Sequence, residues 1–199
     1  AGTDEAATAH LTQALESQVL VVIDADGLTL LSQDSSLREM IATRHASGLA
    51  TVITPHAGEF ARLGFTLPQG CAANRIGAVR DAAASLGAVV LLKGHETVVA
   101  EPSGSAFVNT LSDSCLATAG SGDVLSGLLG SLSAAETARI GQLGFEDAAA
   151  TAACAALIHG LAGCLAGATG RPVTSEDVLA AVPRAIATLR RGERESGEG

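Results

Sequence analysis

The sequence predicts a layered α/β fold in which helices flank a mostly parallel sheet. Short runs rich in Val, Ile and Leu alternate with helical patterns through residue 109, and the rest of the chain is largely helical. This alternation is typical of parallel sheets whose faces are covered by helices. The length of 199 residues and the hydrophobic content of 47% suit a single domain, 1–199, with a substantial core. We expect only the charged, glycine-rich end, 191–199, to fray.

The individual elements follow from apolar runs and from the residues that interrupt them. Three short apolar runs predict buried strands at 19–23, 51–54 and 88–94. Helical patterns predict helices at 24–32, 35–47, 58–64, 71–86, 122–133, 145–168 and 175–190. The last helix begins at TSED, where Thr174 and Asp177 have the spacing of a capping box. Residues 97–109 predict a hairpin, because Glu-Pro-Ser-Gly separates two apolar runs.

Composition and charge argue against several kinds of partner. The net charge of −9, the absence of Trp and Tyr and the presence of only four Phe disfavour nucleic acid. No uninterrupted run of about 18 apolar residues predicts a membrane span, and the start is polar, so we expect no membrane and a cytoplasmic protein. The four cysteines lack metal-binding spacing, and Cys154 and Cys164 are expected to be buried in an alanine-rich helix.

Polar residues follow each of the three predicted parallel strands. They are Asp24 and Asp26, His56 and Glu59, and Lys93 and His95. Ligands of such sheets bind beyond the carboxyl ends of the strands. We therefore expect these side chains to share one rim and to form a binding site there.

The stretch TAGSGDVLSG, 118–127, is the most informative motif. A glycine-rich turn that leads into a helix exposes unpaired N–H groups, which predicts an anion site at Gly120, Ser121 and Gly122. Asp123, directly behind it, is a candidate base that takes a hydroxyl proton while phosphate is held. No Lys-Ser/Thr follows, so the turn is not a Walker A loop. The alternative is that Ser121 or Asp123 is an ordinary helix cap.

Three further positions have a functional and a structural interpretation. Lys93 is the only lysine among twelve basic residues and ends a strand, which favours nucleotide binding over a structural role. His56 and Glu59, three residues apart, are either a metal pair or a solvated histidine with a capping glutamate. His159 lies inside an apolar helix and is expected to be a hydrogen-bonded core residue.

The set of motifs resembles one known family. In order, the chain contains IDADGL, TPHAGEFARL, LLKGHETVVAEPSG, Asn109 with LATAGSGDVLSG, HGLAG and TSEDVLAAVP. These are similar to the motifs of the NAD(P)H-hydrate dehydratases of the ribokinase-like superfamily, over residues 15–185. The resemblance implies a ribokinase-like, three-layer fold. It also implies that the chain starts after an N-terminal segment that the family's domains carry.

The resemblance also implies an activity and a set of site residues. The family restores NADH and NADPH from the hydrates NADHX and NADPHX (S epimer), using ADP or ATP; with ADP, AMP and phosphate are released. By resemblance, Asp123 is the base and contacts the hydrate together with His56. The residues that line the adenine nucleotide are Lys93, Gly94, His95, Glu96, Thr97, Gly120, Ser121 and Gly122. Mg²⁺ is expected to assist, with Glu59 as a guess for a ligand and no ligand assured, and the chain is expected to form homo-oligomers, by resemblance tetramers.

Two alternatives stay open on the sequence. The shared glycine-rich loop also fits a ribokinase-like kinase that phosphorylates a vitamin-precursor alcohol. A catalytically silent fragment that only binds nucleotide fits as well, because the expected N-terminal segment is missing.

Overall fold

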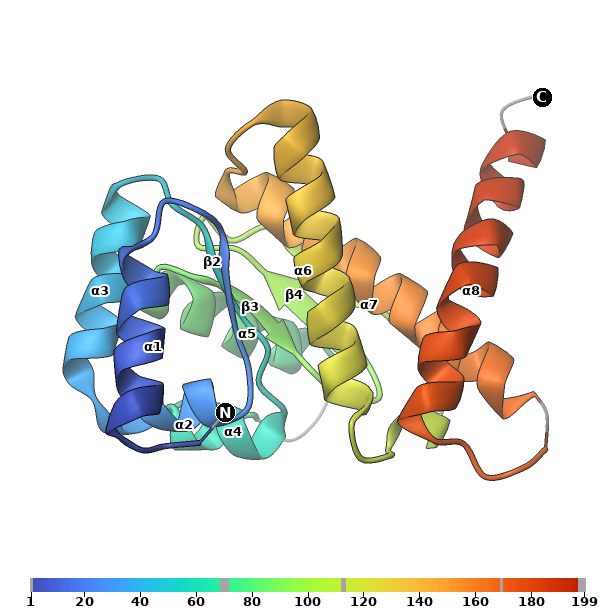
Figure 1. The fold of residues 1–199 in the computed structure, drawn as a ribbon, viewed down its shortest axis with the longest axis horizontal. Helices are drawn as coiled ribbons and strands as arrows, with labels where there is room; N and C mark the ends of the chain where they lie inside the picture. Colours follow the sequence, from blue (N-terminus) through green and yellow to red (C-terminus); the bar gives the residue numbers. More distant parts are fainter. Residues whose placement is uncertain (1, 69–71, 112–113, 169, 197–199) are drawn as a thin grey trace.

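The computed structural model describes residues 2–68, 72–111, 114–168 and 170–196, which form one layered α/β unit (Figure 1). The elements are, in order, α1 (Glu5–Glu16), β1 (Val21–Ile23), α2 (Asp26–Gln33), α3 (Ser35–Ala46), β2 (Thr51–Ile53), α4 (Ala57–Arg62), α5 (Ala72–Leu86), β3 (Val89–Leu92), β4 (Thr97–Ala100), β5 (Ala106–Asn109), the short 3₁₀ helix η1 (Ser114–Leu116), α6 (Ser121–Ile140), α7 (Phe145–Gly167) and α8 (Ser175–Ser196).

The strands form one mixed sheet in the order β1-β2-β3-β4-β5. β1, β2 and β3 are parallel, and Val22 lies opposite Val52 in the register of the first pair. β4 and β5 form the predicted hairpin and add to β3 in antiparallel fashion, with Thr97 opposite Asn109. Because β1 to β3 are parallel, their carboxyl ends lie at the same edge of the sheet.

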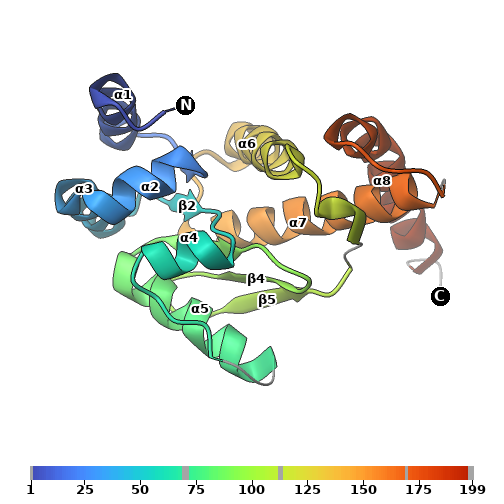
Figure 2. The ribbon, with the colours of Figure 1, turned by 90° about the horizontal axis from the view of Figure 1, so that it is seen from below.

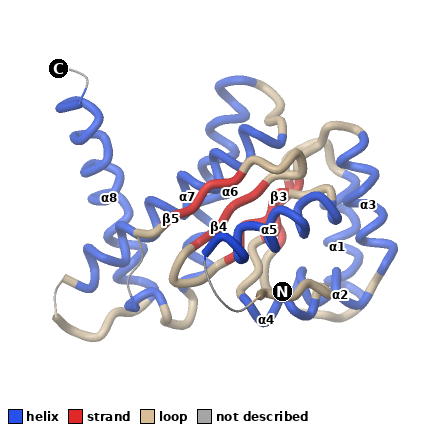
Figure 3. The backbone as a smooth tube through the Cα atoms, turned by 180° about the vertical axis from the view of Figure 1, so that it is seen from behind, coloured by secondary structure: helices blue, strands red, loops and turns tan. Residues whose placement is uncertain are grey.

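Helices cover both faces of the sheet, which gives three layers. Alternate residues of β3 point to opposite faces: Val90 and Leu92 pack with α1 to α5, whereas Val89 and Leu91 pack with α6 and α7. Figure 2 shows α5 and α7 on opposite sides of the strands, and Figure 3 shows α5 in front of β3 and β4. The continuous apolar runs of the sequence are therefore explained, because these strands are buried on both faces.

α7 is a core helix despite its composition. It is the one helix of the described residues that is long and apolar enough to cross a membrane, but more than half of its apolar window is buried within the fold. It packs against β2 to β5 on one side and against α6 and α8 on the other. Alanine and glycine fill most of its buried positions, so its backbone approaches the sheet and the neighbouring helices closely.

Most expected elements are confirmed within a few residues, but α6, expected to end at 133, continues to Ile140. Three further differences stand out. α1 was not expected; Asp4 caps it by accepting the Ala7 N–H at 2.8 Å. α8 continues to Ser196, into the stretch expected to fray, because helix-forming Arg and Glu outweigh one glycine there; 197–199 lie outside the described residues. The expected burial of Cys154 and Cys164 is wrong: Cys154 is exposed and Cys164 half-buried, because both lie off the stripe of α7 that faces the sheet.

Candidate functional site

Lys93 is the point at which the three strand ends meet. Its Nζ donates to Asp24 Oδ1 at 2.7 Å, directly beyond β1, and lies 3.8 Å from Glu59 Oε2 of α4, which follows β2. A Cβ placed on Gly122, at the start of α6, would lie 3.5 Å from the same Nζ. The expectation that three strands deliver polar groups to one rim is therefore confirmed for these residues.

Asp24 is the most constrained carboxylate of this rim. It accepts hydrogen bonds from Lys93, from the Ser126 hydroxyl at 2.8 Å and from the Ala25 N–H at 2.9 Å. Burial would raise the pKa of Asp24, but the hydrogen bond and charge of Lys93, together with the other two donors, lower it. Ala25 has φ +50°, the one non-glycine residue of the described chain in this region, so the backbone next to Asp24 is strained.

His56 and Glu59 cap α4 together. His56 Nδ1 accepts the N–H groups of Gly58 at 2.9 Å and Glu59 at 3.2 Å, and Glu59 Oε2 accepts the His56 N–H at 2.8 Å. This is a capping box with histidine at the N-cap. Glu59 is buried and committed to this cap, so the capping interpretation of Glu59 is confirmed, while the His56 ring stays exposed at the rim.

The start of α6 has the geometry expected of an anion site. Gly120 is the N-cap, with φ +82° and no side chain to cap with, and a Cβ there would lie 2.8 Å from the Ser175 hydroxyl. Among the described residues, the amides of Gly122 and Asp123 donate to no backbone carbonyl. Neither Ser121 nor Asp123 caps the helix, so the simple capping alternative is wrong; Asp123 is exposed in its first turn.

Ser121 points into the protein rather than to the rim. Its hydroxyl is buried and lies 3.1 Å from Nε2 of His159 on α7. Burial lowers the pKa of His159, against the contact with Ser121, and the charge of Lys93 lowers it further, so the ring is neutral. His159 is thus the hydrogen-bonded core residue that the sequence predicts. Through its contact with Ser121, His159 supports the glycine-rich turn before Asp123 from the protein interior.

The segment 93–97 connects β3 to β4. Gly94 and His95 are exposed, and Glu96 and Thr97 are half-buried. Arg75 of α5 lies beside it, with Nη2 donating to the Lys93 carbonyl at 3.3 Å. Sequence reasoning missed Arg75, because an arginine in an alanine-rich helix gives no local signal. It also missed Ser126, one turn into α6.

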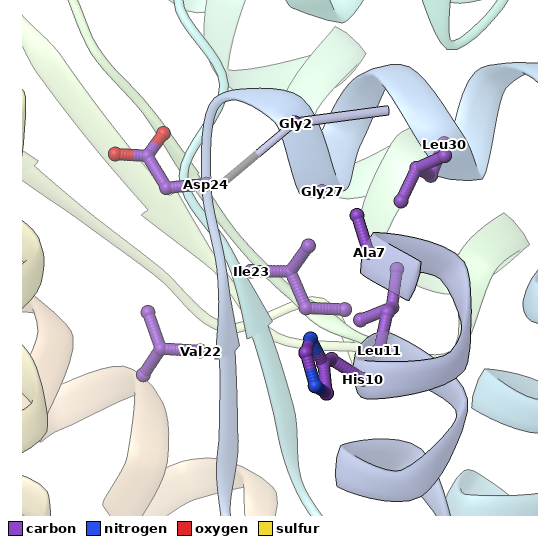
Figure 4. A pocket seen from close by; sticks show the side chains of 9 residues that line it. All are labelled: Gly2, Ala7, His10, Leu11, Val22, Ile23, Asp24, Gly27 and Leu30. Atoms are coloured by element: carbon purple, nitrogen blue, oxygen red, sulfur yellow. The ribbon is translucent and has the colours of Figure 1, made fainter. Parts of the chain in front are cut away.

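Asp26 does not belong to the shared rim, contrary to expectation. Its Oδ2 accepts the Gly2 N–H at 2.8 Å, because Asp26 lies in the first turn of α2 and faces the chain that enters α1. A cavity of about 300 Å³ lies on this side, along the free edge of β1 (Figure 4). Apart from His10 and Asp24, the residues that line the cavity are apolar or glycine. Of the rim residues Asp24, His56, Glu59, Lys93 and Gly122, only Asp24 also lines this cavity.

The described residues contain no group of three or more His, Cys, Asp or Glu that could hold a metal ion. Mg²⁺ is commonly held by one or two carboxylates, water and the phosphates of a substrate.

Comparison with known proteins identifies the family to which the chain is similar. The Carb_kinase family model, described as NAD(P)H-hydrate dehydratase, matches residues 1–184. The chain is 51% identical over 131 residues to the bifunctional NAD(P)H-hydrate repair enzyme Nnr of Mycobacterium tuberculosis, covering 66% of this chain and 26% of that protein. It is 44% identical over 133 residues to the ADP-dependent (S)-NAD(P)H-hydrate dehydratase of Neisseria meningitidis, covering 66% and 44%.

The fold is also similar to that of a solved structure of this family. The crystal structure of the ADP/ATP-dependent NAD(P)H-hydrate dehydratase of Bacillus subtilis, co-crystallized with ATP/Mg²⁺, superimposes with a TM-score of 0.71 at 22% identity, covering 94% of this chain and 61% of that one. The chain thus spans only part of the relatives that it matches. The family match over residues 1–184, the ordered motifs and the shared fold together establish that this chain belongs to the NAD(P)H-hydrate dehydratase family.

Proposed function

We propose that this chain carries out the nucleotide-dependent dehydration of NADHX and NADPHX (S epimer) to NADH and NADPH, with ADP or ATP as co-substrate. The observation that supports the proposal most directly is the position of the Lys93 ammonium. It lies against Gly122 at the N-terminal end of α6, one residue from the exposed carboxylate of Asp123. An anion site next to a carboxylate suits the transfer of a phosphoryl group to a hydroxyl.

In the proposed reaction the phosphate of the nucleotide lies between Lys93 and the amides of Gly122 and Asp123. Positive charge and helix N–H groups at that place stabilise negative charge on the transferred group. The Asp123 carboxylate takes the proton of the ring hydroxyl, whose oxygen then bonds to the terminal phosphorus of ADP while AMP leaves. The phosphate then leaves with the electron pair of its C–O bond, and the neighbouring ring carbon gives a proton to solvent, so that the electron pair of that C–H bond forms the double bond.

The remaining site residues receive roles by their position. His56 is exposed at the start of α4, so we assign it to the hydrate together with Asp123. Gly94, His95, Glu96 and Thr97 follow Lys93 and are assigned to the adenine nucleotide, as are Gly120 and Gly122. Ser121 supports that turn through His159. We propose Mg²⁺ as a companion of the nucleotide phosphates, a cytoplasmic location, and a homo-oligomeric assembly.

The test combines turnover with nucleotide binding. NADHX, ADP and Mg²⁺ are incubated with the full chain, and recovery of NADH is followed by its absorbance. We expect Asp123→Asn to abolish recovery while the Kd for ADP stays within about threefold, since Asp123 is exposed and caps nothing. Glu146→Gln, an exposed carboxylate in the first turn of α7, is the matched control and should retain activity.

Three outcomes contradict the proposal in different ways. Unfolding of Asp123→Asn would make Asp123 a structural residue. Phosphorylation of a thiazole or pyrimidine alcohol without recovery of NADH would favour the small-molecule kinase. Binding of ADP without any turnover would favour a fragment that only binds nucleotide.

A further inference from the structure

We infer that Arg75 is a positioning residue that holds the segment 93–97 in the shape that binds the nucleotide; the inference rests on the proposed function. Arg75 lies in the first turns of α5, behind the connection between β3 and β4. Its Nη2 donates to the Lys93 carbonyl at 3.3 Å. A Cβ added to Gly94 would lie 2.4 Å from Nη2 and 3.3 Å from Cζ, so the guanidinium is packed against the Gly94 backbone.

The backbone N–H and the backbone carbonyl of Lys93 both form hydrogen bonds with other parts of the protein. Its N–H donates to the Pro55 carbonyl at 2.8 Å, which continues the pairing of β2 and β3, and its carbonyl accepts from Arg75. With the backbone fixed at both ends of this residue, the side chain can extend to Asp24 on the opposite side. Arg75 therefore acts on the ammonium indirectly, through the main chain of Lys93.

Gly94 and Glu96, between Lys93 and the start of β4, have little backbone support of their own. Within the described parts of the chain, neither Gly94 nor Glu96 takes part in a backbone–backbone hydrogen bond outside the strands. Ordering a connection with few backbone hydrogen bonds costs conformational entropy, and a side chain packed against it offsets part of that cost. The Arg75 guanidinium lies against this connection, and its charge also interacts with Glu96.

The position of Arg75 is costly for a purely structural residue. Burial lowers the pKa of its guanidinium, against the opposing charge of Glu96, and Nε is buried with no hydrogen-bond partner among the described residues. An unpaired buried donor and a partly desolvated cation both reduce stability. Such a cost calls for an explanation, and support of the 93–97 segment supplies one.

The test measures the Kd for ADP by calorimetry and the KM and kcat of the full chain. We expect Arg75→Gln to raise the Kd and the KM for ADP about tenfold while kcat changes less than about twofold, because the chemistry at Asp123 is untouched. Arg75→Lys, which keeps the charge and a donor, should recover part of the affinity. Arg80→Gln, an exposed arginine on the same helix, is the matched control and should bind ADP as the original chain does.

Gly94→Ala gives an independent perturbation of the same contact. Its methyl group would displace the guanidinium, so it should weaken ADP binding in the same direction. In the double variant Gly94→Ala/Arg75→Gln the two losses should not add, because both remove one interaction.

Several results would overturn the inference. These are normal ADP affinity in Arg75→Gln, equal effects in Arg80→Gln, or additive losses in the double variant. If Arg75→Gln unfolds, the ADP affinities of Arg75→Lys and Gly94→Ala test the inference instead, and normal affinity in both would overturn it. If the original chain binds ADP without dehydrating NADHX, the proposed function fails and the inference about binding stands. If it binds no ADP, both fail.

Discussion

Replacing Lys93 with Met removes the cation around which the rim is assembled. The ammonium is hydrogen-bonded to Asp24 at 2.7 Å and lies 3.8 Å from Glu59. Methionine keeps most of the apolar volume of the lysine stem, so the substitution tests the charge rather than the packing. We expect the free energy of unfolding at pH 7 to fall by about 2 kcal/mol.

The size of this loss follows from the exposure of the two side chains. Exposed ion pairs contribute at most about 1 kcal/mol, whereas breaking a buried pair costs about 3–5 kcal/mol. The side chains of Lys93 and Asp24 are 22% and 14% exposed, which places this pair between the two limits. Ser126 and the Ala25 N–H still donate to Asp24 in the variant, so the carboxylate keeps part of its stabilisation.

The same pair predicts a dependence on pH. The pKa of Asp24 is lowered in the folded chain because the contributions of Lys93, Ser126 and Ala25 outweigh burial. A carboxyl group of this kind stabilises the fold above its unfolded pKa, near 3.8, and the stabilisation is lost as the pH falls through the folded value. Without Lys93 most of this lowering disappears. The difference in stability between the two proteins should therefore shrink below about pH 4.

Urea unfolding between pH 7 and pH 3 measures this directly. The original chain is compared with Lys93→Met, Asp24→Asn and the double variant, and the double-mutant cycle isolates the pair. A coupling energy of about 2 kcal/mol at pH 7 that declines toward pH 3 agrees with the reasoning. A loss that is the same at every pH, or a coupling near zero, would refute the idea that this ion pair organises the rim.

Three further predictions concern other parts of the fold. Gly160→Ala should destabilise the chain by about 1–3 kcal/mol in urea unfolding, because its Cβ would lie 1.9 Å from the Leu111 carbonyl oxygen. Gly127→Ala is the control and should stabilise the chain by up to about 1 kcal/mol, because its Cβ would meet nothing within 4 Å. Arg44→Met should lower the free energy of unfolding by at least about 3 kcal/mol and speed amide exchange in α1, because Arg44 donates to the carbonyls of Leu15 and Val19 before β1 and of Ala50 before β2; faster exchange limited to α3 would contradict this. The pKa of Asp177 is lowered to about 2 by the hydrogen bond from Arg171 and those from Thr174. Asp177 should therefore stabilise the start of α8 above about pH 4 and lose this effect toward pH 2, which amide exchange or NMR of α8 measures. Asp177→Asn should flatten that profile.

Much of the fold could be predicted from the sequence because its signals are local. Strands buried on both faces are continuous apolar runs, and the hairpin turn is marked by Pro and Gly at 102–104. Errors arose where tertiary context decides. α1 has few strongly apolar positions, and its packing against α3 depends on a fold that local patterns do not contain. Cys154 lies in an apolar helix, but only the position of the sheet determines which stripe of α7 is buried.

Some residues of the candidate site could likewise be predicted from the sequence, and others could not. Lys93, Glu59 and the glycine turn before Asp123 carry sequence signals of their own, and the topology brings the first two together with Gly122. Asp24 and Asp26 look equivalent in the sequence, and only the geometry at the end of β1 sends one to Lys93 and the other to Gly2. Arg75 has no sequence signal at all. Its role comes from the packing of α5 behind the 93–97 segment.

The charge of the rim bears on how an adenine nucleotide could bind to so acidic a chain. Asp24 and Glu59 lie against one ammonium, which is itself hydrogen-bonded to Asp24, and the exposed Asp123 follows Gly122, in a chain of net charge −9. The protein therefore offers little net positive charge to a diphosphate, beyond the N–H groups at the start of α6. A divalent cation carried by the nucleotide would supply what is missing.

The negative charge of the rim fixes the sign of a salt effect on ADP binding. Without Mg²⁺ the carboxylates of the rim repel ADP, so raising the ionic strength from about 0.01 to 0.15 M should screen that repulsion and strengthen binding. With Mg²⁺ bound to the nucleotide the complex carries less negative charge, and the salt dependence should become small. Calorimetry under the four combinations of salt and Mg²⁺ measures both effects. Weaker ADP binding at high salt in the absence of Mg²⁺ would show that Lys93 and the start of α6 attract the nucleotide more strongly than the carboxylates repel it.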